Sequence, residues 1–581
     1  MSSLLISAAH KSSGKTTVTV GLCAALSAQG TVVQPFKKGP DYIDPMWLAQ
    51  ASGRDCFNLD SYLMTQEQIT DCFTRQSVGS DISIVEGNKG LYDGLALDGS
   101  NSNAALAHLL DMPVVLVLDA RGMTRGIAPL ILGYQAFDAH IRIAGVILNQ
   151  LGGARHESKL RAVIEYYTDV QVLGAIGHDP RLAVVERHLG LMPNHELDDA
   201  SQRVRAMGEL IGSQVDLSKV LQIAASVAPL LSSAIAPTAT PPTLQPSRVR
   251  IGLARDKAFG FYYPDDLLAL EQAGAEIIPF DTLHDTRLPE VDGLFIGGGF
   301  PEMFMPELQA NTALRSSIKA AIESDMPVYA ECGGLMYLAR TLRWKGEVYN
   351  MVGALAADVV MHDRPVGRGY VALETTSDAP WRTDIGQTLR GHEFHYSSLE
   401  NVAPGLKFAY RVKRGHGVDG ERDGIVYRKV LASYAHLRSG AGSDWAAQFV
   451  AFVRAQSMTL KAPIPALVAT MSVLVSGKAI DTDTEGYIKN LDEWSEEFAL
   501  ARAKAEHLEL TEAHWQVIAF LRAYYEEHRV QAQVRAMIWH FSKVWGPELG
   551  NNHHLHTLFP IGGPQKQGNR LAGLLKTKGE H

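Results

Sequence analysis

Residues 4–17 read Leu-Leu-Ile-Ser-Ala-Ala-His-Lys-Ser-Ser-Gly-Lys-Thr-Thr, an apolar run that leads into a glycine–lysine loop. Where such a loop joins a strand to a helix, backbone N–H groups at the helix start face bound phosphates. Lys15 would then reach the β- and γ-phosphate oxygens, and the Thr16 hydroxyl would coordinate Mg²⁺. Ala9 replaces the first glycine of the usual pattern, whereas Gly14 is kept. We therefore expect this phosphate-binding loop (P-loop) to hold ATP, with Gly14 and Thr17 beside Lys15 and Thr16.

Short apolar strands alternate with helical stretches from this loop to about residue 222. Such a βαβ rhythm predicts a parallel sheet that is covered by helices on both faces. The expected strands are Leu4–Ala8, Thr31–Phe36, Ile82–Glu86, Val114–Asp119 and Ile143–Asn149, and the expected helices include Thr16–Gln29 and Asn101–Leu110.

Three further segments follow, so the sequence predicts an α/β protein with several domains. Residues 223–247 hold five prolines and almost no charge, which is typical of a linker. A second α/β rhythm fills residues 248–457, after the P-loop domain of residues 1–222. Residues 466–581 are rich in helical, acidic and aromatic patterns and predict a small α-rich domain. The expected elements here are the strands Gly293–Gly297, Val328–Ala330 and Ile425–Tyr427 and the helices Glu497–His507 and Thr511–His528.

Composition excludes several classes of protein. With 581 residues, of which 46% are hydrophobic and 20% charged, the chain is too long for one small binding module and is typical of a globular protein. The net charge of −9 argues against a nucleic-acid partner. Four cysteines make no disulfide framework and favour a reducing, cytoplasmic location. No stretch approaches the ~20 apolar residues of a membrane helix, so we expect no membrane association.

Acidic side chains follow two of the expected strands. Residues 37–45 read Lys-Lys-Gly-Pro-Asp-Tyr-Ile-Asp-Pro, and residues 85–94 read Val-Glu-Gly-Asn-Lys-Gly-Leu-Tyr-Asp-Gly. Ligands bind at the carboxyl ends of strands in open α/β sheets, and Mg²⁺ takes oxygen ligands. We therefore expect Thr16, Asp41 and Glu86 to hold the metal.

The same two loops supply candidates for substrate contacts. Lys37 and Lys38 lie beside the nucleotide site and suit an anionic substrate better than a plain solvated surface. Asp44 and Asp93 stand next to a proline and a glycine, so turn formation explains them as well as substrate contact does. The expected substrate residues are Lys38, Tyr42, Asp44, Tyr92 and Asp93.

A cysteine in the second α/β segment has the setting of a nucleophile. Residues 325–337 read Asp-Met-Pro-Val-Tyr-Ala-Glu-Cys-Gly-Gly-Leu-Met-Tyr, which is a strand, a cysteine and small residues that open a helix. A lone cysteine is usually a small buried hydrophobe, but a helix N-terminus favours the thiolate. We expect Cys332 to be the nucleophile. Free N–H groups for an oxyanion are expected at Gly298, Gly299 and Gly333.

The cysteine needs a base, and three histidines are candidates. His392 and His395 lie in the block Arg-Gly-His-Glu-Phe-His-Tyr, and His436 lies in Ala-Ser-Tyr-Ala-His-Leu-Arg. A purely structural role explains the first two equally well, so the residues alone leave the choice open.

Residues 1–457 resemble the cobyrinic acid a,c-diamide synthase family, whose second half is a class I (triad) glutamine amidotransferase. The resemblance rests on residues 37–45 and 85–94 and on Leu-Val-Leu-Asp-Ala-Arg-Gly-Met-Thr-Arg-Gly (116–126), Gly-Val-Ile-Leu-Asn-Gln (145–150) and Arg-His-Leu-Gly-Leu-Met-Pro (187–193). It implies that ATP activates a tetrapyrrole carboxylate as an acyl phosphate and that L-glutamine supplies ammonia. At residues 88–89 this chain has Asn-Lys, where the family usually has an apolar pair or Arg-Met.

The resemblance also implies roles for single residues. Asn149 would lie near the nucleotide base, and His436 would be the base for Cys332. A third group, an acid or a histidine, commonly follows two residues later, where this chain has Arg438. The partner that orients His436 is therefore left open. His392 and His395 would support the structure or the acceptor site.

The tail resembles the DsrC/TusE family of small sulfur-relay proteins, which are partners of dissimilatory sulfite reductase. Asn569 and Glu580 stand at the positions of that family's cysteines, and residues 466–581 contain no thiol, so sulfur transfer by this domain is excluded. A docking or regulatory role remains. The matching stretches are residues 477–499, 510–528 and 558–579.

The combination bears on the acceptor. Sulfite reductases use sirohaem, a carboxylate-rich tetrapyrrole, so we expect sirohaem or its metal-free precursor as the substrate, with cobyrinic acid as the alternative. We further expect a homodimer that contacts sulfite reductase components. Two readings of another class are a P-loop switch ATPase, which would need no Cys332, and a scaffold whose enzyme parts are vestigial.

Overall fold

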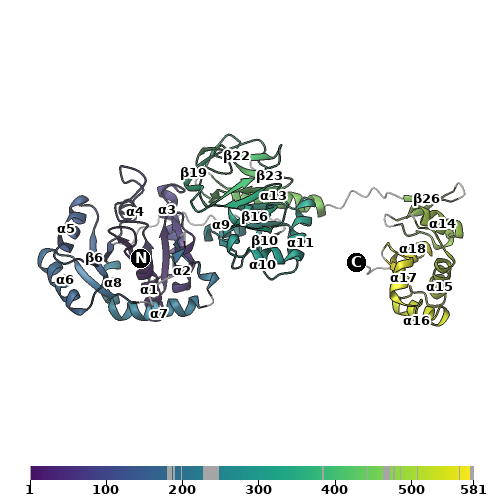
Figure 1. Ribbon diagram of the computed structural model, residues 1–581, viewed down its shortest axis with the longest axis horizontal. Helices are drawn as coiled ribbons and strands as arrows, with labels where there is room; N and C mark the ends of the chain where they lie inside the picture. Colours follow the sequence, from purple (N-terminus) through teal and green to yellow (C-terminus); the bar gives the residue numbers. More distant parts are fainter. Residues whose placement is uncertain are drawn as a thin grey trace, which may run out of the picture. The chain divides into compact units, whose positions relative to one another are not determined.

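The computed structural model describes residues 2–179, 186–187, 190–197, 199–226, 248–381, 385–440, 443–461, 471–475, 478–483, 486–506, 508–561 and 563–575. Two compact units comprise Met1–Leu460 and Lys461–His581 (Figure 1). Most of the expected linker, residues 223–247, lies outside the described residues, and the division of the first unit into two domains stays a prediction. Among the helices of the described residues, none combines the length and the apolar character that a membrane crossing requires.

A seven-stranded sheet forms the first part of the larger unit, in the order β3-β2-β4-β1-β5-β6-β7. Each neighbouring pair is parallel, which confirms the predicted class. The five predicted strands are present, whereas β3 and β7 were not predicted because one has three residues and the other holds two glycines. The strands are β1 (Ser2–Ala8), β2 (Val33–Lys38), β3 (Phe57–Leu59), β4 (Ile82–Glu86), β5 (Val114–Asp119), β6 (Ile143–Leu151) and β7 (Gln171–Gly177).

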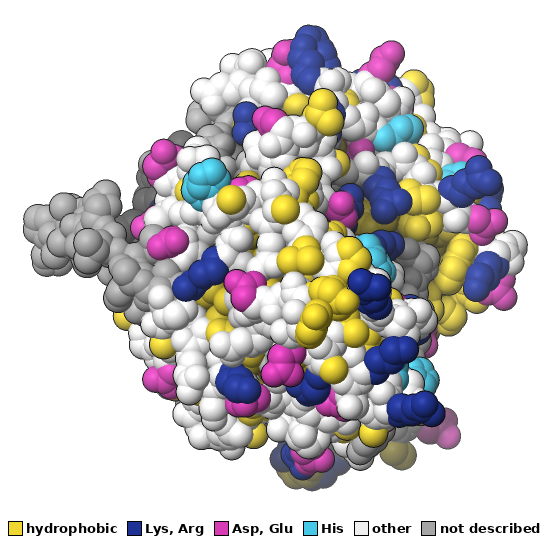
Figure 2. All heavy atoms as spheres, turned by 90° about the vertical axis from the view of Figure 1, so that its left-hand side faces the viewer, with side chains coloured by type: hydrophobic (Ala, Val, Ile, Leu, Met, Phe, Trp, Pro, Cys, Tyr) yellow, Lys and Arg dark blue, Asp and Glu magenta, His cyan; other side chains and the backbone are white. Residues whose placement is uncertain are grey.

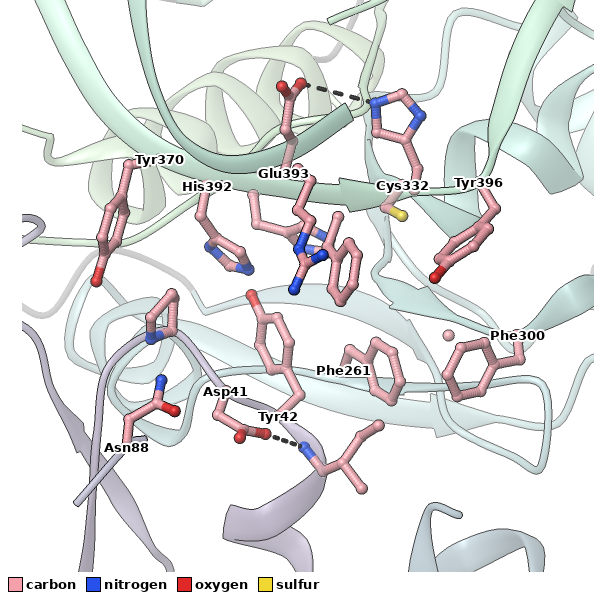
Figure 3. Close-up of a pocket in the computed structure, with 18 of the residues that line it drawn as sticks. Asp41, Tyr42, Asn88, Phe261, Phe300, Cys332, Tyr370, His392, Glu393 and Tyr396 are labelled. Atoms are coloured by element: carbon pink, nitrogen blue, oxygen red, sulfur yellow. Dashed lines mark hydrogen bonds and ion pairs between the residues drawn. The ribbon is translucent and has the colours of Figure 1, made fainter. Parts of the chain in front are cut away.

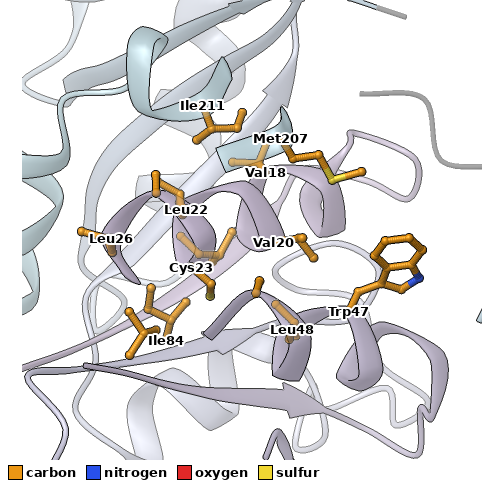
Figure 4. Packing of buried hydrophobic residues seen from close by; sticks show 14 of the residues in the cluster. Val18, Val20, Leu22, Cys23, Leu26, Trp47, Leu48, Ile84, Met207 and Ile211 are labelled. Carbon is orange, nitrogen blue, oxygen red and sulfur yellow. The ribbon is translucent and has the colours of Figure 1, made fainter. Parts of the chain in front are cut away.

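Helices cover both faces of this sheet and leave a core on each side. In β1, Leu4 and Ile6 belong to one core and Leu5 to the other, as the period of two along a strand requires. Figure 4 shows the first core, where α1 packs against α2 and α7. The helices are α1 (Lys15–Ala28), α2 (Ile43–Ser52), α3 (Gln66–Gln76), α4 (Asn103–Leu109), α5 (Ile127–Phe137), α6 (Ala154–Tyr167), α7 (Ala200–Gln214) and α8 (Leu217–Ala224).

The second sheet has ten strands in the order β12-β10-β13-β15-β24-β23-β22-β19-β20-β25. The first five strands pair in parallel, and the remaining pairs are antiparallel. The three predicted strands of this segment are confirmed as β13, β15 and β23. The bounds are β10 (Val249–Ala254), β12 (Ala275–Phe280), β13 (Gly293–Ile296), β15 (Val328–Glu331), β19 (Gly367–Thr375), β20 (Thr388–His395), β22 (Lys407–Arg414), β23 (Arg422–Tyr427), β24 (Val430–Ser433) and β25 (His436–Leu437).

Shorter elements complete this part of the unit. A two-stranded pair joins β11 (Phe259–Phe261) to β14 (Gly298–Gly299), and a four-stranded sheet has the order β17-β16-β18-β21. These four strands are β16 (Thr341–Trp344), β17 (Glu347–Asn350), β18 (Asp358–Met361) and β21 (Ser397–Glu400). The helices are α9 (Pro264–Gln272), α10 (Met305–Ala310), α11 (Thr312–Glu323), α12 (Gly333–Leu338) and α13 (Trp445–Lys461).

The tail is a small helical domain, as predicted, and its described residues also contain a hairpin that was not predicted. Thr511 begins the longest helix with a capping box, in which its N–H donates to His514 Nδ1 at 3.1 Å. Asn569 is buried and donates to Gln531 at 2.8 Å. The elements are β26 (Met471–Val475), β27 (Lys478–Thr482), α14 (Glu496–Ala505), α15 (Glu512–His528), α16 (Val534–Val544), α17 (Asn552–Leu558) and α18 (Asn569–Leu571).

Candidate active site

The glycine–lysine loop has the geometry of a phosphate site. Gly14 ends the loop at φ 84°, and Lys15, Thr16 and Thr17 open α1. Asn149, at the end of β6, donates to the Ser13 carbonyl at 2.9 Å, and a Cβ on Gly14 would lie 2.1 Å from its amide nitrogen. The loop therefore requires glycine at position 14 for two reasons, the positive φ of this residue and the close approach of Asn149. All five residues predicted to bind ATP lie together.

A charged cluster lies beside this loop. Thr16 Oγ1 donates to Glu86 Oε1 at 2.7 Å and to Asp44 Oδ2 at 3.2 Å. The Lys37 ammonium donates to the same two carboxylates, at 2.8 Å to Glu86 and 2.5 Å to Asp44, and lies 3.8 Å from Asp41. Lys37 is 2% exposed, so it does not face a substrate as the sequence had suggested.

Burial and charge together set the protonation of this cluster. Burial and the neighbouring Asp44 raise the pKa of Asp41 to about 7. Burial alone would also raise the pKa of Asp44, but Lys37 more than offsets it and holds that pKa below its usual range. Burial would lower the pKa of Lys37, and the carboxylates around it raise that pKa well above its ordinary value instead. Lys37 therefore stays charged.

The donor set suits Mg²⁺. Thr16, Asp41 and Glu86 offer the hard oxygen atoms that this ion prefers, and the second carboxylate oxygen of Glu86 is buried without a hydrogen-bond partner among the described residues. Within the described ranges, no group of three or more acidic, histidine or cysteine side chains is arranged to hold a metal by itself.

Cys332 lies at a sharp turn between β15 and α12. Its φ of 47° and ψ of −101° are unusual for a residue with a Cβ, and its N–H donates to the Ser433 carbonyl at 2.7 Å. Burial and then the Glu302 carboxylate raise the pKa of the Cys332 thiol, while the N–H of Gly333 lowers it. The thiol is therefore protonated at rest and needs a base before it can attack.

His436 is held by a carboxylate that the sequence had not singled out. Its Nδ1 lies 3.2 Å from Glu331 Oε2, and the N–H of Leu437 donates to Glu331 Oε1 at 3.0 Å. Glu331 is 3% exposed and directly precedes Cys332. The orienting partner is thus not at Arg438, two residues after the histidine, but at the end of the strand that carries the nucleophile.

We predict that Glu331→Gln lowers glutamine hydrolysis at least about tenfold, because a positioned general base contributes roughly 10²–10⁴-fold and the amide cannot balance an imidazolium. Initial rates of glutamate release measure this effect. Amidation with free ammonia is expected to stay within about twofold. Glu323→Gln, at the surface end of α11, is the matched control. An unchanged rate in Glu331→Gln would show that this carboxylate does not assist the base.

The predicted oxyanion glycines gather beside Cys332. A Cβ on Gly333 would lie 3.0 Å from the backbone nitrogen of Gly299, and a Cβ on Gly298 would lie 2.6 Å from His436 Cε1. Only glycine permits such close approach of β14 to the turn and to the histidine. The three N–H groups therefore belong to one small region.

One cavity of about 490 Å³ joins the thiol to the loops of the first sheet. Cys332 and His436 line it together with Asp41, Asn88 and Lys89. Figure 3 shows Asp41, Tyr42 and Asn88 on one side and Cys332, Tyr370 and His392 on the other. The nucleophile and the loops next to the P-loop thus share a single space.

The predicted substrate residues divide around this cavity. Lys38, Tyr42 and Asp93 line it. Asp44 lies in the carboxylate cluster instead, and the hydroxyl of Tyr92 donates to the Tyr134 carbonyl at 2.7 Å. Neither is among the described residues that line the cavity.

Aromatic rings pack around the base. The His392 ring stacks on that of His436 with centroids 4.9 Å apart, and burial lowers the pKa of His392 well below its usual value. Tyr42 lies 5.2 Å from the His436 ring and 4.5 Å from Tyr263. His395 stacks on Tyr434 at 3.8 Å and also lines the cavity. His392 is therefore a wall residue next to the base, and His395 is a wall residue that packs on Tyr434.

Comparisons with known proteins agree with this arrangement. Residues 2–186 match the family described as AAA domain, and residues 250–442 match the CobB/CobQ-like glutamine amidotransferase domain. A cobyrinate a,c-diamide synthase of Magnetococcus marinus is 46% identical over 453 residues, which are 78% of this chain and 97% of that protein. A cobyrinate a,c-diamide synthase of Methanosarcina acetivorans is 44% identical and is covered over 94% of its length.

The tail matches a separate family. Residues 474–579 match the family described as DsrC like protein. The solved structure of Allochromatium vinosum DsrC is 44% identical over 19% of this chain and 97% of its own, with a TM-score of 0.18.

Proposed function

Because the chain belongs to the cobyrinate a,c-diamide synthase family, we propose that it uses ATP and glutamine to convert peripheral carboxylates of a tetrapyrrole into amides. The cavity that Cys332 shares with Asp41, Asn88 and Lys89 is the observation that carries this proposal. A switch ATPase would have no use for a buried thiol, base and carboxylate next to its nucleotide loop.

In the glutamine half, His436 takes the proton from Cys332 Sγ, and the sulfur attacks the side-chain amide of glutamine. The N–H groups of Gly298, Gly299 and Gly333 stabilise the oxyanion, and Glu331 balances the imidazolium. His436 returns the proton to the leaving nitrogen, so ammonia departs. Water then hydrolyses the thioester and releases glutamate.

In the ATP half, Lys15 and the helix N-terminus hold the phosphates, with Gly14, Thr17 and Asn149 shaping the loop. Thr16, Asp41 and Glu86 would hold Mg²⁺, which neutralises phosphate charge when bound. Lys38, Tyr42 and Asp93 face the acceptor from the cavity wall. The acceptor carboxylate attacks the γ-phosphorus of ATP, and ADP leaves, which gives an acyl phosphate. Ammonia then attacks the acyl carbon, phosphate leaves, and loss of one proton to water gives the amide.

Two acceptors compete in this proposal. The DsrC-like tail favours sirohaem or its metal-free precursor, because sulfite reductases use sirohaem and DsrC proteins are partners of the dissimilatory enzyme. The names of the relatives favour cobyrinic acid. We prefer sirohaem, since the tail is the part that sets this chain apart from those relatives.

Mass spectrometry of the products tests both acceptors. The full chain is incubated with ATP, Mg²⁺ and glutamine and with sirohaem, its metal-free precursor or cobyrinic acid. Each amide formed lowers the product mass by the difference between hydroxyl and amino groups, which counts the amidations. Amidation of cobyrinic acid alone would contradict the sirohaem preference, and amidation of none would contradict the function.

We also propose that the tail docks the enzyme on a sulfite reductase component, supported by the family match over residues 474–579. The segment has no cysteine, so its contribution would be binding rather than chemistry.

Homodimer formation is a further proposal, and Leu132 and Phe137 of α5 are exposed at 43% and 75%. Figure 2 shows the end of the unit that carries α5, where hydrophobic and charged side chains intermingle. Light scattering tests the dimer. The four unpaired cysteines support a cytoplasmic location.

Deleting residues 466–581 is expected to leave amidation within about twofold and to weaken binding to purified dissimilatory sulfite reductase at least about tenfold, a loss of roughly 1.4 kcal/mol. The two compact units of the chain support this separation. Biolayer interferometry on the full and shortened chains measures it. Equal binding by both would move the docking site elsewhere, and loss of glutaminase turnover in a folded short chain would contradict the independence of the tail.

A further inference from the structure

Arg438 links the strand of the base to the first sheet. It follows His436 by two residues and is 3% exposed. Its Nε donates to Asp265 Oδ2 at 2.7 Å, and its Nη2 donates to the backbone carbonyl of Asn58 at 2.7 Å. Asn58 lies in β3, so this side chain crosses from the glutamine half to the ATP half of the unit.

Asn58 in turn holds the loop that follows β2. It is 1% exposed, and its Nδ2 donates to the carbonyls of Gly39 at 2.8 Å and Asp41 at 2.7 Å. The N–H of Gly39 donates to the Leu59 carbonyl at 3.0 Å. The loop of residues 39–42, here called the acceptor loop, is therefore hydrogen-bonded to Asn58 of β3, the residue whose carbonyl accepts from Arg438.

The far end of the acceptor loop returns to the base. The ring of Tyr42 lies 5.2 Å from that of His436 and 4.5 Å from that of Tyr263. The Arg438 guanidinium lies 5.2 Å from the centre of the same Tyr263 ring. The acceptor loop is thus connected to residues 436–438 in two places, by the ring contact of Tyr42 with His436 and, through Asn58, by the hydrogen bond of Arg438.

The hydrogen bonds of Arg438 are directed at two acceptors, Asp265 and the carbonyl of Asn58. Removing a guanidinium from water is costly, and only hydrogen bonds and charge compensate for it. Its Nη1 finds no acceptor among the described residues, so Asp265 and the Asn58 carbonyl are its hydrogen-bonding partners. The planar fork of arginine suits two acceptors at fixed angles, which a lysine does not reproduce.

We propose that Arg438 is a positioning residue that holds the acceptor loop against the glutaminase base, so that ammonia freed at Cys332 is captured by the activated carboxylate. Ammonia that is not captured takes up a proton from water and is lost as ammonium. This role rests on the proposed function and adds the device that couples its two halves.

The test compares glutamate released with amide formed. Arg438→Met removes both hydrogen bonds, and the double variant Asp265→Asn with Arg438→Met removes the charge of the partly buried Asp265 as well. The assays use sirohaem and, in parallel, cobyrinic acid, with glutamine or with ammonia as the nitrogen source. Amide formed per glutamate is expected to fall at least about threefold, since ammonia freed beside a displaced acceptor loop is lost before the activated carboxylate captures it. Glutaminase and ammonia-supported rates are expected to stay within about twofold.

Asn58→Ala breaks the same link from the other side and gives an independent arm. It should lower the same ratio, and combining it with Arg438→Met should add little, because both changes interrupt one chain of contacts. Arg411→Met removes a surface arginine that pairs with Glu374 and is the matched control. Thermal melting of each variant excludes a general loss of folding, and Asn58→Ala decides the question if both Arg438 variants fail to fold.

The outcomes separate cleanly. An unchanged ratio of amide to glutamate overturns the positioning role. An equal fall in the rate of amide formation with glutamine and with ammonia overturns it as well, because Arg438 would then not serve the transfer of ammonia between the halves. A wild-type enzyme that amidates neither probe overturns the proposed function and this proposal with it.

Discussion

Cys332→Ala is expected to abolish amidation with glutamine, lowering glutamate release at least about 10³-fold, while amidation with ammonia persists. Cys332 is the only cysteine of residues 248–457, so no second thiol is available to replace it. We expect the ATP half to be unaffected, because the hydrogen bonds of its charged cluster join Thr16, Lys37, Asp44 and Glu86 to one another. Ammonia must be unprotonated to attack, so the residual reaction should rise with pH.

Product mass and glutamate release are measured side by side for this variant. Cys72→Ala removes another buried thiol, from α3, and is expected to keep both nitrogen sources working. A Cys332→Ala enzyme that still used glutamine fully would exclude Cys332 as the nucleophile. Loss of the ammonia reaction in a folded variant would mean that the two halves are not separable.

Lys15→Ala is expected to stop amidation with both nitrogen sources, by roughly 10²–10³-fold, as the loss of one donor to developing negative charge does in other enzymes. Burial and the nearby Lys37 lower the pKa of Lys15, and no ion pair to it forms among the described residues. Its ammonium is therefore available for phosphate. Glutamine hydrolysis without acceptor should be little changed, because Lys15 does not line the cavity of Cys332.

ATP turnover and product mass measure this prediction. Lys159→Ala, on the exposed side of α6, is the matched control for the loss of a lysine. Amide formation that survived Lys15→Ala would remove the P-loop from the reaction. The opposite patterns of Cys332→Ala and Lys15→Ala with free ammonia are what distinguish a two-site amide synthase from a switch ATPase.

Local patterns predicted the parts of the site that depend on consecutive residues. The P-loop and the turn at Cys332 are each built from a strand end and the next few residues, so their spacing survives folding unchanged. Glu331 was missed although it is the neighbour of Cys332. Its partner arrives from β25, and that meeting depends on β15 lying beside β24 in the second sheet, which pairs Glu331 with Ser433. A single sequence does not give the order of strands.

Lys37 was misread for a related reason. Beside the nucleotide loop it was expected to face an anionic substrate, but strand pairing places Lys37 opposite Glu86 and buries it between two carboxylates. Arg438 is a third example, since its partner Asn58 is 380 positions away along the chain. In each of these residues the charge could be read from the sequence and the partner could not.

The position of Lys37 has a consequence for the resting enzyme. With its ammonium lodged between Asp44 and Glu86, the pocket carries its own counter-charge before any nucleotide arrives. The folded state therefore holds an internal cation at these two carboxylates, which Lys37 supplies in place of a dissolved ion.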